Sequence, residues 1–304
     1  MKKRIKIIFF GSDSFSVPIL EALRDNFELA LVVTKTNNQL GKKDKRLNFL
    51  ECHPALDAGS INKIKKVEAD LYVVAAFGLM IPESLLKSPR GISTINLHPS
   101  LLPKYRGPSP IESALLNGDQ KTGVSIIVLD EKMDHGPIIA QEEEMIDSDD
   151  DFITLSERLE KRGADLLIKT IPDFVAGKIK LKPQNDSQAS YCHLIKKENG
   201  QIDFKKDATE IIRQVRAFIH WPGSFALWRE KNKTIKIIEA RLQSQLPEPP
   251  FTAAMVFKTS DAKPAIVCGN GTIVIETLQL EGKKPTDSIS FLNGYPDFIG
   301  ANLS

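Results

Sequence analysis

The first half of the chain alternates short apolar segments with amphipathic ones, and this alternation restricts its fold more than any other feature. Apolar and β-branched runs bounded by turn residues predict buried strands at 5–10, 27–34, 71–76, 92–96 and 124–129. Apolar residues at helical spacing predict helices at 17–26, 82–86, 110–116 and 153–174. Strands that alternate with helices indicate an α/β fold with a Rossmann-like, doubly wound, mostly parallel sheet.

The pattern changes after residue 179. Residues 180–190 are polar and contain Pro183, Asn185 and Asp186, a composition typical of a linker. Short strands separated by Gly or Pro follow one more helix, which predicts a small, mostly antiparallel, OB-like β-barrel. We expect a catalytic domain over 1–179, a linker over 180–203 and a C-terminal domain over 204–304. The predicted elements of the last part are a helix at 208–218 and strands at 234–239, 254–258, 265–268 and 272–278.

Composition excludes several classes of protein. Of 304 residues, 41% are apolar and 26% are charged, which is the balance of a globular chain and not of a disordered one. The apolar runs are much shorter than the roughly 20 residues that span a bilayer, so we expect no membrane segment and a cytoplasmic location. The three cysteines (Cys52, Cys192 and Cys268) are too scattered for a disulfide framework or a zinc site, and we expect no metal.

The net charge of +2 conceals separate charged patches. Residues 35–46 contain five basic side chains and one acidic one, and 196–241 contain eleven basic and six acidic ones. Seven acidic residues lie within 142–151. A solvated face would explain any one of these patches, but two basic patches together favour a polyanionic partner such as RNA.

A dense polar cluster lies at 95–107, with the sequence INLHPSLLPKYRG. On a strand, side chains alternate between the two faces, so Asn96 and His98 lie on one face. They also lie where a parallel strand ends, which is the edge of an α/β sheet that binds ligands. A hydrogen-bonded turn is the alternative interpretation of Asn-x-His. A dinucleotide-binding enzyme is disfavoured, because Gly11 stands alone where G-x-G-x-x-G would be expected.

The residue types in this cluster suit reactions that pass through a tetrahedral carbonyl intermediate. An amide N–H can stabilise a developing oxyanion, and an imidazole can transfer a proton near neutral pH. A carboxylate that orients the imidazole would complete the set. Asp130 and Asp134, both after the strand at 124–129, are the candidates.

The cluster resembles a known signature when it is taken with its neighbours. Residues 96–107, Gly118-Asp119, Thr122-Gly123 and 130–136 together resemble the 10-formyltetrahydrofolate-dependent formyltransferases. The segment 73–82 is similar to the folate-pocket strand and loop of that family. The resemblance runs through nearly the whole chain, and the members it resembles most closely act on methionyl-tRNA. The motifs that carry this last point lie at 11–18, 191–193, 196–203, 278–284 and 291–294.

The resemblance implies transfer of a formyl group from 10-formyltetrahydrofolate to the α-amino group of methionine on initiator tRNA. It implies that Asn96, His98 and Asp134 are catalytic, with Asp134 orienting and charging His98. Initiator methionyl-tRNA and the folate co-substrate are the expected partners of a monomer. Plain core packing is the alternative role for Leu101 and Leu102. The folate site would be formed by Phe77, Gly78, Leu79, Met80, Ile81, Ser100, Leu101, Leu102 and Pro103.

One segment departs from the family pattern. Residues 36–60 do not match the longer basic loop and the further strand found there, so we expect the third strand to be lost or replaced. Lys42, Lys43 and Arg46 would be the remnant of the loop that binds tRNA. Two alternatives stay open: a formyltransferase acting on an amino-sugar nucleotide, and an RNA-binding homologue without catalytic activity.

Overall fold

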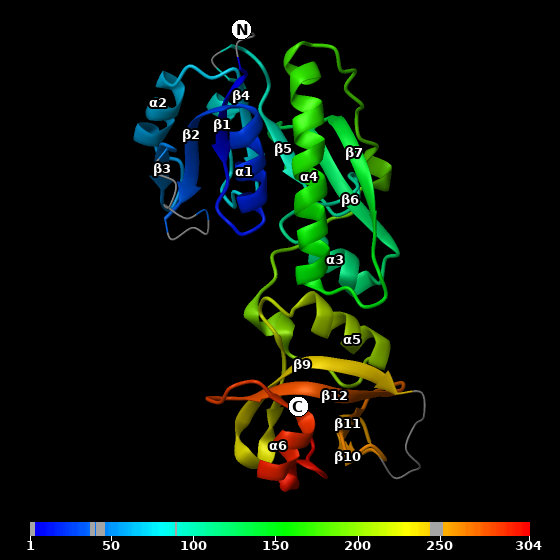
Figure 1. Ribbon diagram of the computed structural model, residues 1–304. Helices are drawn as coiled ribbons and strands as arrows, with labels where there is room; N and C mark the ends of the chain where they lie inside the picture. The colour runs from blue at the N-terminus through cyan, green and yellow to red at the C-terminus, as the bar shows by residue number, and fades with distance from the viewer. Residues whose placement is uncertain (1–3, 37–39, 41–45, 89, 244–251) are drawn as a thin grey trace. The chain divides into compact units, whose positions relative to one another are not determined.

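Two sheets, one in each of two structural units, organise the chain (Figure 1). The structure is a computed structural model that describes residues 4–36, 40, 46–88, 90–243 and 252–304. The first unit comprises Met1–Ile111, Gln120–Ile146 and Thr154–His193. The second comprises Glu112–Asp119, Asp147–Ile153 and Leu194–Ser304. Of the segment expected to be a linker, residues 180–193 fall in the first unit and residues 194–203 in the second.

The sheet of the first unit has seven strands in the order β3-β2-β1-β4-β5-β6-β7. The strands from β3 to β5 pair in parallel, whereas β6 is antiparallel to both β5 and β7. The prediction of a mostly parallel, Rossmann-like sheet is confirmed. The strands are β1 (Lys6–Phe10), β2 (Glu28–Lys35), β3 (Phe49–Cys52), β4 (Leu71–Ala75), β5 (Ile95–His98), β6 (Lys121–Val128) and β7 (Ile138–Met145).

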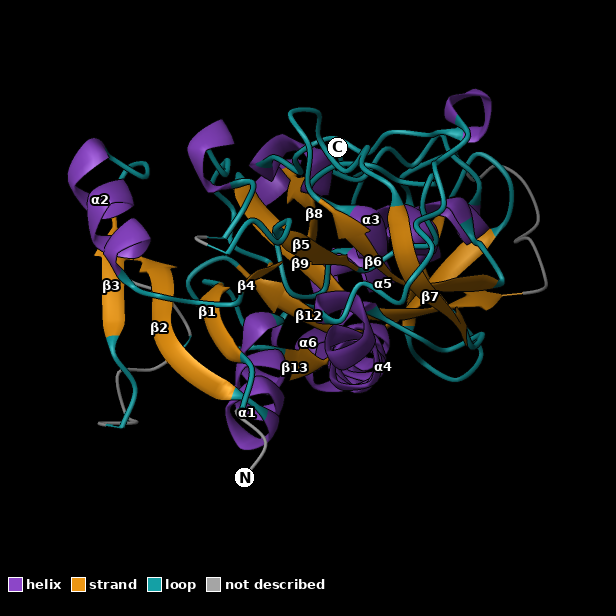
Figure 2. Cartoon of the chain, turned by 90° about the horizontal axis from the view of Figure 1, so that it is seen from above, coloured by secondary structure: helices purple, strands orange, loops and turns teal. Residues whose placement is uncertain are grey.

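Helices cover both faces of this sheet. Figure 2 shows α1 (Ser16–Asn26) and α4 (Phe152–Val175) on one face and α2 (Ala58–Lys66) on the other. Successive side chains of β1, β2 and β4 point to opposite faces of the sheet, and the apolar side chains on one face pack against Ile64 of α2. This buried set includes Ile8, Phe10, Leu31, Val33, Tyr72 and Val74.

Two strands differ from the sequence predictions. The third strand, expected to be lost or replaced, is not lost, because β3 pairs in parallel with β2 and leads into α2. Strand β7 was not predicted, since Glu142 to Glu144 lack an apolar pattern. It is an edge strand whose Glu144 pairs with Arg158 at 3.1 Å and with Arg162 at 2.5 Å.

Two boundaries also moved. The helix predicted at 82–86 is a single 3-10 turn, η1 (Glu83–Leu85). Strand β5 begins at Ile95 and not at Ile92, because Thr94 donates its backbone N–H to Leu86 instead of joining the sheet.

The second unit contains an antiparallel sheet in the order β10-β11-β12-β9-β8, with β13 beside β12. Trp228 is 1% exposed and packs on Phe291 and Phe298.

The remaining elements of the chain follow α3 (Pro110–Asn117) and α4. In chain order they are η2 (Asp186–Gln188), η3 (Lys197–Gly200), α5 (Ala208–Ala217), β8 (Ser224–Trp228), η4 (Arg229–Lys231), β9 (Lys233–Gln243), β10 (Val256–Lys258), β11 (Pro264–Val267), β12 (Thr272–Leu280), β13 (Thr286–Asp287), α6 (Ser288–Gly294) and η5 (Pro296–Phe298).

The helices of the described chain are short or strongly charged. Within the described residues, no helix is both long enough and apolar enough to cross a membrane.

The contact between α4 and β5 yields a test of the packing beneath the site. A Cβ added at Gly163 of α4 would lie 2.6 Å from Leu97 Cδ2, and Leu97 is 1% exposed. Overpacking of this kind costs about 1–3 kcal/mol. Alanine gains only roughly 1 kcal/mol over glycine in a helix. We therefore expect Gly163→Ala to lower the midpoint of urea denaturation.

Gly59 of α2 provides the matched control. A Cβ added there would lie 3.6 Å from its nearest neighbour, Asp57 Oδ1, so Gly59→Ala meets no clash. We expect this variant to unfold at the wild-type urea concentration or above it. If both glycine variants were equally stable, the packing of α4 on Leu97 would not be as tight as the structure indicates.

Candidate active site

Strand β5 carries the first two residues of the site. It lies inside the sheet between β4 and β6, with Leu97 paired to Ala75 on one side and to Ile126 on the other. Leu97 faces the core beneath α4, so Asn96 and His98 lie on the opposite face of the sheet. The sequence predicted this alternation, and the structure brings both side chains to one place.

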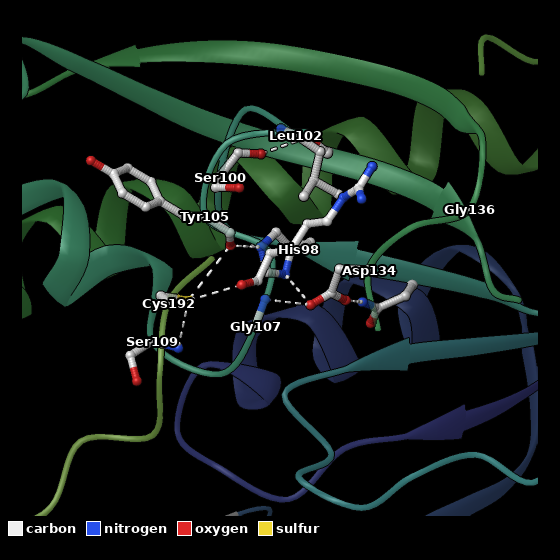
Figure 3. A network of polar contacts seen from close by, with 12 residues as sticks. His98, Ser100, Leu102, Tyr105, Gly107, Ser109, Asp134, Gly136 and Cys192 are labelled. Atoms are coloured by element: carbon white, nitrogen blue, oxygen red, sulfur yellow. Dashed lines mark hydrogen bonds and ion pairs between the residues drawn. The ribbon is translucent and has the colours of Figure 1, made fainter. Parts of the chain in front are cut away.

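Asp134 is the third residue, and it reaches the other two from the loop between β6 and β7 (Figure 3). Asn96 Nδ2 donates to Asp134 Oδ1 at 3.3 Å, and His98 Nδ1 lies 3.6 Å from Asp134 Oδ2. Of the two carboxylates considered, Asp134 faces the site. Asp130 instead pairs with His135, at 2.7 Å from Oδ2 to Nδ1.

The route of this loop was not expected. Because β6 runs antiparallel to β5, its last residue, Val128, pairs with Ile95 at the start of β5. The loop that follows must therefore run back along β5 to bring Asp134 to His98. The loop 130–137 thus reaches His98 from the opposite end of the strand.

The His98 ring is oriented by the main chain as well as by Asp134. Its Nε2 lies 2.9 Å from the carbonyl oxygen of Tyr105. A carbonyl can only accept, so Nε2 carries a proton and donates it. Nδ1 is then the nitrogen that faces Asp134 and can exchange a proton. The ring is 4% exposed, and these two contacts leave it little freedom.

The backbone after His98 also contributes to the site. The Gly107 N–H donates to Asp134 Oδ2 at 2.9 Å, and Gly107 has a φ of 124°. A Cβ at this position would lie 2.3 Å from the carbonyl oxygen of Cys192. Only glycine combines this φ with so close an approach of two main chains. Cys192 in turn donates its backbone N–H to the Arg106 carbonyl at 2.9 Å.

The residues predicted to line the folate site fall into two groups. Phe77 and Leu102 are 2% and 3% exposed and belong to hydrophobic cores, and Ser100 is buried with its hydroxyl donating to the Lys104 carbonyl. The side chain of Leu102 packs with Ile127 and Ile138. The others present at least some surface: Gly78 and Met80 are exposed, whereas Leu79, Ile81, Leu101 and Pro103 are partly buried.

Residues 76–81 leave β4 at the level of His98. The pairing of Ala75 with Leu97 sets this level, so both strands end at the same edge. Met80 is 67% exposed there, and Ala76 adopts a φ of 44° as the chain turns out of the strand. The segment thus offers apolar surface beside the polar cluster.

The remaining predicted residues are placed only in part. Lys42 and Lys43 lie outside the residues that the structure describes, and Arg46 is exposed. Within the described ranges, no group of three or more His, Cys, Asp or Glu side chains is arranged to hold a metal ion.

Sequence reasoning missed a polar network behind Asp134. Gln184 donates to the carbonyls of Asp134 and Gly136, both at 2.8 Å, and accepts from Arg106. Arg106 is 1% exposed and pairs with Asp186 at 2.8 Å, and this hydrogen bond lowers the pKa of Asp186. Arg106 belonged to the recognised motif, but nothing in the sequence distinguished Gln184 from other linker residues.

Comparisons with known proteins agree with this architecture. Residues 3–171 match the family Formyl transferase, and residues 194–296 match Formyl transferase, C-terminal domain. A methionyl-tRNA formyltransferase of Listeria monocytogenes is 35% identical over 98% of this chain and 97% of its own. One from Pelobacter propionicus is 34% identical over 98% of this chain and 95% of its own.

Solved structures share the fold at lower identity. WlaRD, a sugar 3N-formyl transferase, has a TM-score of 0.67 at 24% identity, covering 92% of this chain and 99% of that one. HypX from Aquifex aeolicus, in complex with tetrahydrofolic acid, has a TM-score of 0.67 at 16% identity, covering 98% of this chain and 48% of that one.

The chain therefore matches both family domains, and its relatives are more than 30% identical to it over nearly their full length. The chain belongs to the formyl transferase family, and within it to the methionyl-tRNA formyltransferases.

Proposed function

We propose that the chain transfers the formyl group of 10-formyltetrahydrofolate to the α-amino group of methionine on initiator tRNA. The observation that carries this proposal is the meeting of Asn96 and His98 at Asp134, within 3.3 and 3.6 Å. An amide donor, an imidazole and a carboxylate are the groups that such a transfer requires. An RNA-binding homologue without activity would have no need to keep them together.

The reaction sets the tasks of these residues. A bond forms between the amine nitrogen and the formyl carbon, and the bond from that carbon to N10 of the folate breaks. The amine nitrogen loses protons, and N10 gains one. Between these steps the formyl oxygen carries negative charge that the protein must stabilise.

Asn96 is suited to the oxygen. An amide NH2 has two donors, so one can bind Asp134 while the other bonds to the formyl oxygen. His98 assists the departure of the folate nitrogen by donating from Nδ1, because Nε2 is held by the Tyr105 carbonyl.

Asp134 is suited to the amine. The methionyl amine must lose a proton before it can attack, and the carboxylate accepts it directly or through water. Its hydrogen bonds from Asn96 and Gly107 hold it in place for this step. Its Oδ2 also lies 3.6 Å from His98 Nδ1, close enough to orient the ring.

The segments at 77–81 and 100–103 fit a folate co-substrate. Met80, Leu79 and Ile81 offer apolar surface at the edge where β5 ends, and such surface suits a flat pterin. A relative of the same fold, HypX, was solved with tetrahydrofolic acid, and WlaRD with 5-N-Formyl-THF. In this chain the folate supplies the activated formyl group, and these residues orient it toward Asn96.

The second unit is suited to bind the tRNA. We propose that its antiparallel sheet acts as an OB-like barrel, supported by bridges that link Asn302 to Met255 and Leu303 to Trp228. Its basic residues between 196 and 241 would contact phosphates, together with Lys42, Lys43 and Arg46 of the N-terminal half. We expect the protein to act as a monomer in the cytoplasm.

Replacement of the three central residues tests the mechanism. Removal of one oxyanion donor typically lowers kcat by about 10²–10³-fold, and we expect this for Asn96→Ala. We expect His98→Ala and Asp134→Asn to lower kcat by at least about 10³-fold, because both act mainly in the transition state. Single-turnover formylation of initiator Met-tRNA measures the effect, and circular dichroism checks the fold.

The substrate is tested in the same assay. The wild-type protein is offered initiator Met-tRNA and an amino-sugar nucleotide in parallel, each with 10-formyltetrahydrofolate. We expect product only from the tRNA. Formylation of the sugar alone would replace the proposed substrate, and near-wild-type turnover by His98→Ala would show that its role is assigned wrongly.

The basic loop is tested through the salt dependence of binding. Each phosphate that a protein neutralises releases condensed counterions, so tRNA affinity should fall steeply as salt rises. Replacement of Lys42, Lys43 and Arg46 by alanine should raise KM for Met-tRNA and flatten the salt dependence. KM for the folate donor should stay unchanged, since its site lies at the sheet edge.

A matched triple variant on another basic segment controls for net charge. Lys63, Lys65 and Lys66 of α2 are exposed, whereas Ile64 between them is buried in the core. Replacing the three lysines by alanine and leaving Ile64 in place removes the same charge from a different segment. This variant should keep the wild-type KM for Met-tRNA. Equal effects of both triple variants would assign the result to overall charge and not to the loop.

A further inference from the structure

The side chain of Gln184 uses all of its hydrogen-bonding capacity on two parts of the active site. Its Nε2 donates to the carbonyl oxygens of Asp134 and Gly136, each at 2.8 Å. Its Oε1 accepts from Arg106 Nε at 3.0 Å and from Nη2 at 2.9 Å. One amide group therefore connects the loop that carries Asp134 to the loop that follows His98.

The chemistry of its neighbours determines the orientation of this amide. If the amide were turned over, Oε1 would face two carbonyl oxygens and the NH2 group would face guanidinium N–H groups. Every contact would then be repulsive. The four hydrogen bonds therefore favour one orientation strongly, and the side chain acts as a rigid connection.

Arg106 holds Gln184 from the other side. Its guanidinium is 1% exposed, and a buried charge is costly unless it is paired. Asp186 supplies the negative charge at 2.8 Å, and the Tyr191 hydroxyl accepts from Nη1 at 3.3 Å. The three guanidinium partners named here, Gln184, Asp186 and Tyr191, lie within residues 184–191, so this buried charge anchors the segment that carries Gln184.

Asp134 needs such support. It has a φ of 49°, in the left-handed region that non-glycine residues adopt at a cost. Gln184 binds the carbonyl of Asp134 itself and that of Gly136, two residues later, so it spans the turn that sets this conformation. A shift of about 1 Å in a catalytic group can cost about 10²-fold in rate.

We propose that Gln184 is a positioning residue that holds Asp134 in its reactive place against Asn96 and His98. The inference rests on the proposed function for its kinetic consequence, but the contact it describes can be measured without any substrate. It assigns a role to a segment that the sequence marks only as a linker.

Gln184→Glu is the sharpest variant. The carboxylate can still pair with Arg106, so the buried charge stays neutralised, but its second oxygen faces the two loop carbonyls and repels them. We expect kcat for formylation to fall by about 10–100-fold. KM for Met-tRNA and for the folate donor should stay within twofold, because Gln184 touches neither proposed binding surface. A simple loss of folded protein would lower the active fraction and the heat-denaturation midpoint instead.

Two further variants separate the causes. Gln184→Met removes the hydrogen bonds without adding repulsion, and it should lower kcat in the same direction. Gln188→Glu places the same substitution on an exposed side chain of η2 and should leave kcat at the wild-type value. Wild-type kcat in Gln184→Met would overturn the proposal.

A double-mutant cycle tests whether Gln184 acts through Asp134. In an Asp134→Asn background, Gln184→Glu should lower kcat by less than about twofold, since the group that it positions is already inactive. Independent, multiplicative losses in the double variant would show that Gln184 acts elsewhere and would overturn the proposal.

An activity-independent measurement keeps this inference distinct from the proposed function. In protein with 15N-labelled histidines and no substrate, we expect Gln184→Glu to shift the His98 Nδ1 signal, because Asp134 Oδ2 moves away from it. Gln188→Glu should leave the signal in place. An unshifted signal in Gln184→Glu would overturn the positioning role. If the signal shifts in Gln184→Glu but the wild-type protein formylates no tRNA, only the proposed function is refuted.

Discussion

The carboxylate of Asp134 is the point on which the candidate active site depends. Its Oδ1 accepts from Asn96, and its Oδ2 accepts from the Gly107 N–H and lies beside His98 Nδ1. The side chain is 12% exposed, so water screens these contacts poorly and each of them is stronger than it would be at the surface. Three separate segments of chain, β5, the loop after it and the β6–β7 loop, thus meet at one partly buried carboxylate.

That meeting requires backbone conformations that the chain would not adopt alone. Tyr105 and Asp134 have φ values of 61° and 49°, which cost roughly 1–3 kcal/mol each in non-glycine residues. Hydrogen bonds from neighbouring segments offset this cost, including Tyr105 N to Ser190 Oγ at 2.9 Å. Glycine appears where no side chain fits: a Cβ on Gly136 would lie 1.8 Å from the Val128 carbonyl oxygen.

The buried guanidinium of Arg106 explains why residues 184–191 pack against the loop after β5, within the first unit. Arginine presents five donors in a fixed plane, and a buried site must satisfy them. Gln184, Asp186 and Tyr191 do so from a polar segment that lacks any apolar pattern. Polar complementarity, and not hydrophobic burial, therefore attaches this segment to the loop that carries Arg106.

The sequence by itself determined the elements that rely on local pattern. Apolar runs marked β1, β2, β4 and β6, and alternation along β5 placed Asn96 and His98 on one face. These predictions succeed because the spacing of apolar residues can be observed within a short stretch of sequence. The same logic failed for β7, where the pattern of the edge strand is charged, and for β3, which is too short to stand out.

Only the tertiary structure decided which distant groups meet. Residue pattern alone left Asp130 and Asp134 open, and only the family resemblance favoured Asp134. The contact of Asp134 with His98 depends on the path of a loop that turns back along β5, and the support from Gln184 depends on Arg106, a buried charge 78 residues earlier in the chain. No local pattern encodes these contacts, because they arise from the need to satisfy buried polar groups once the chain has folded.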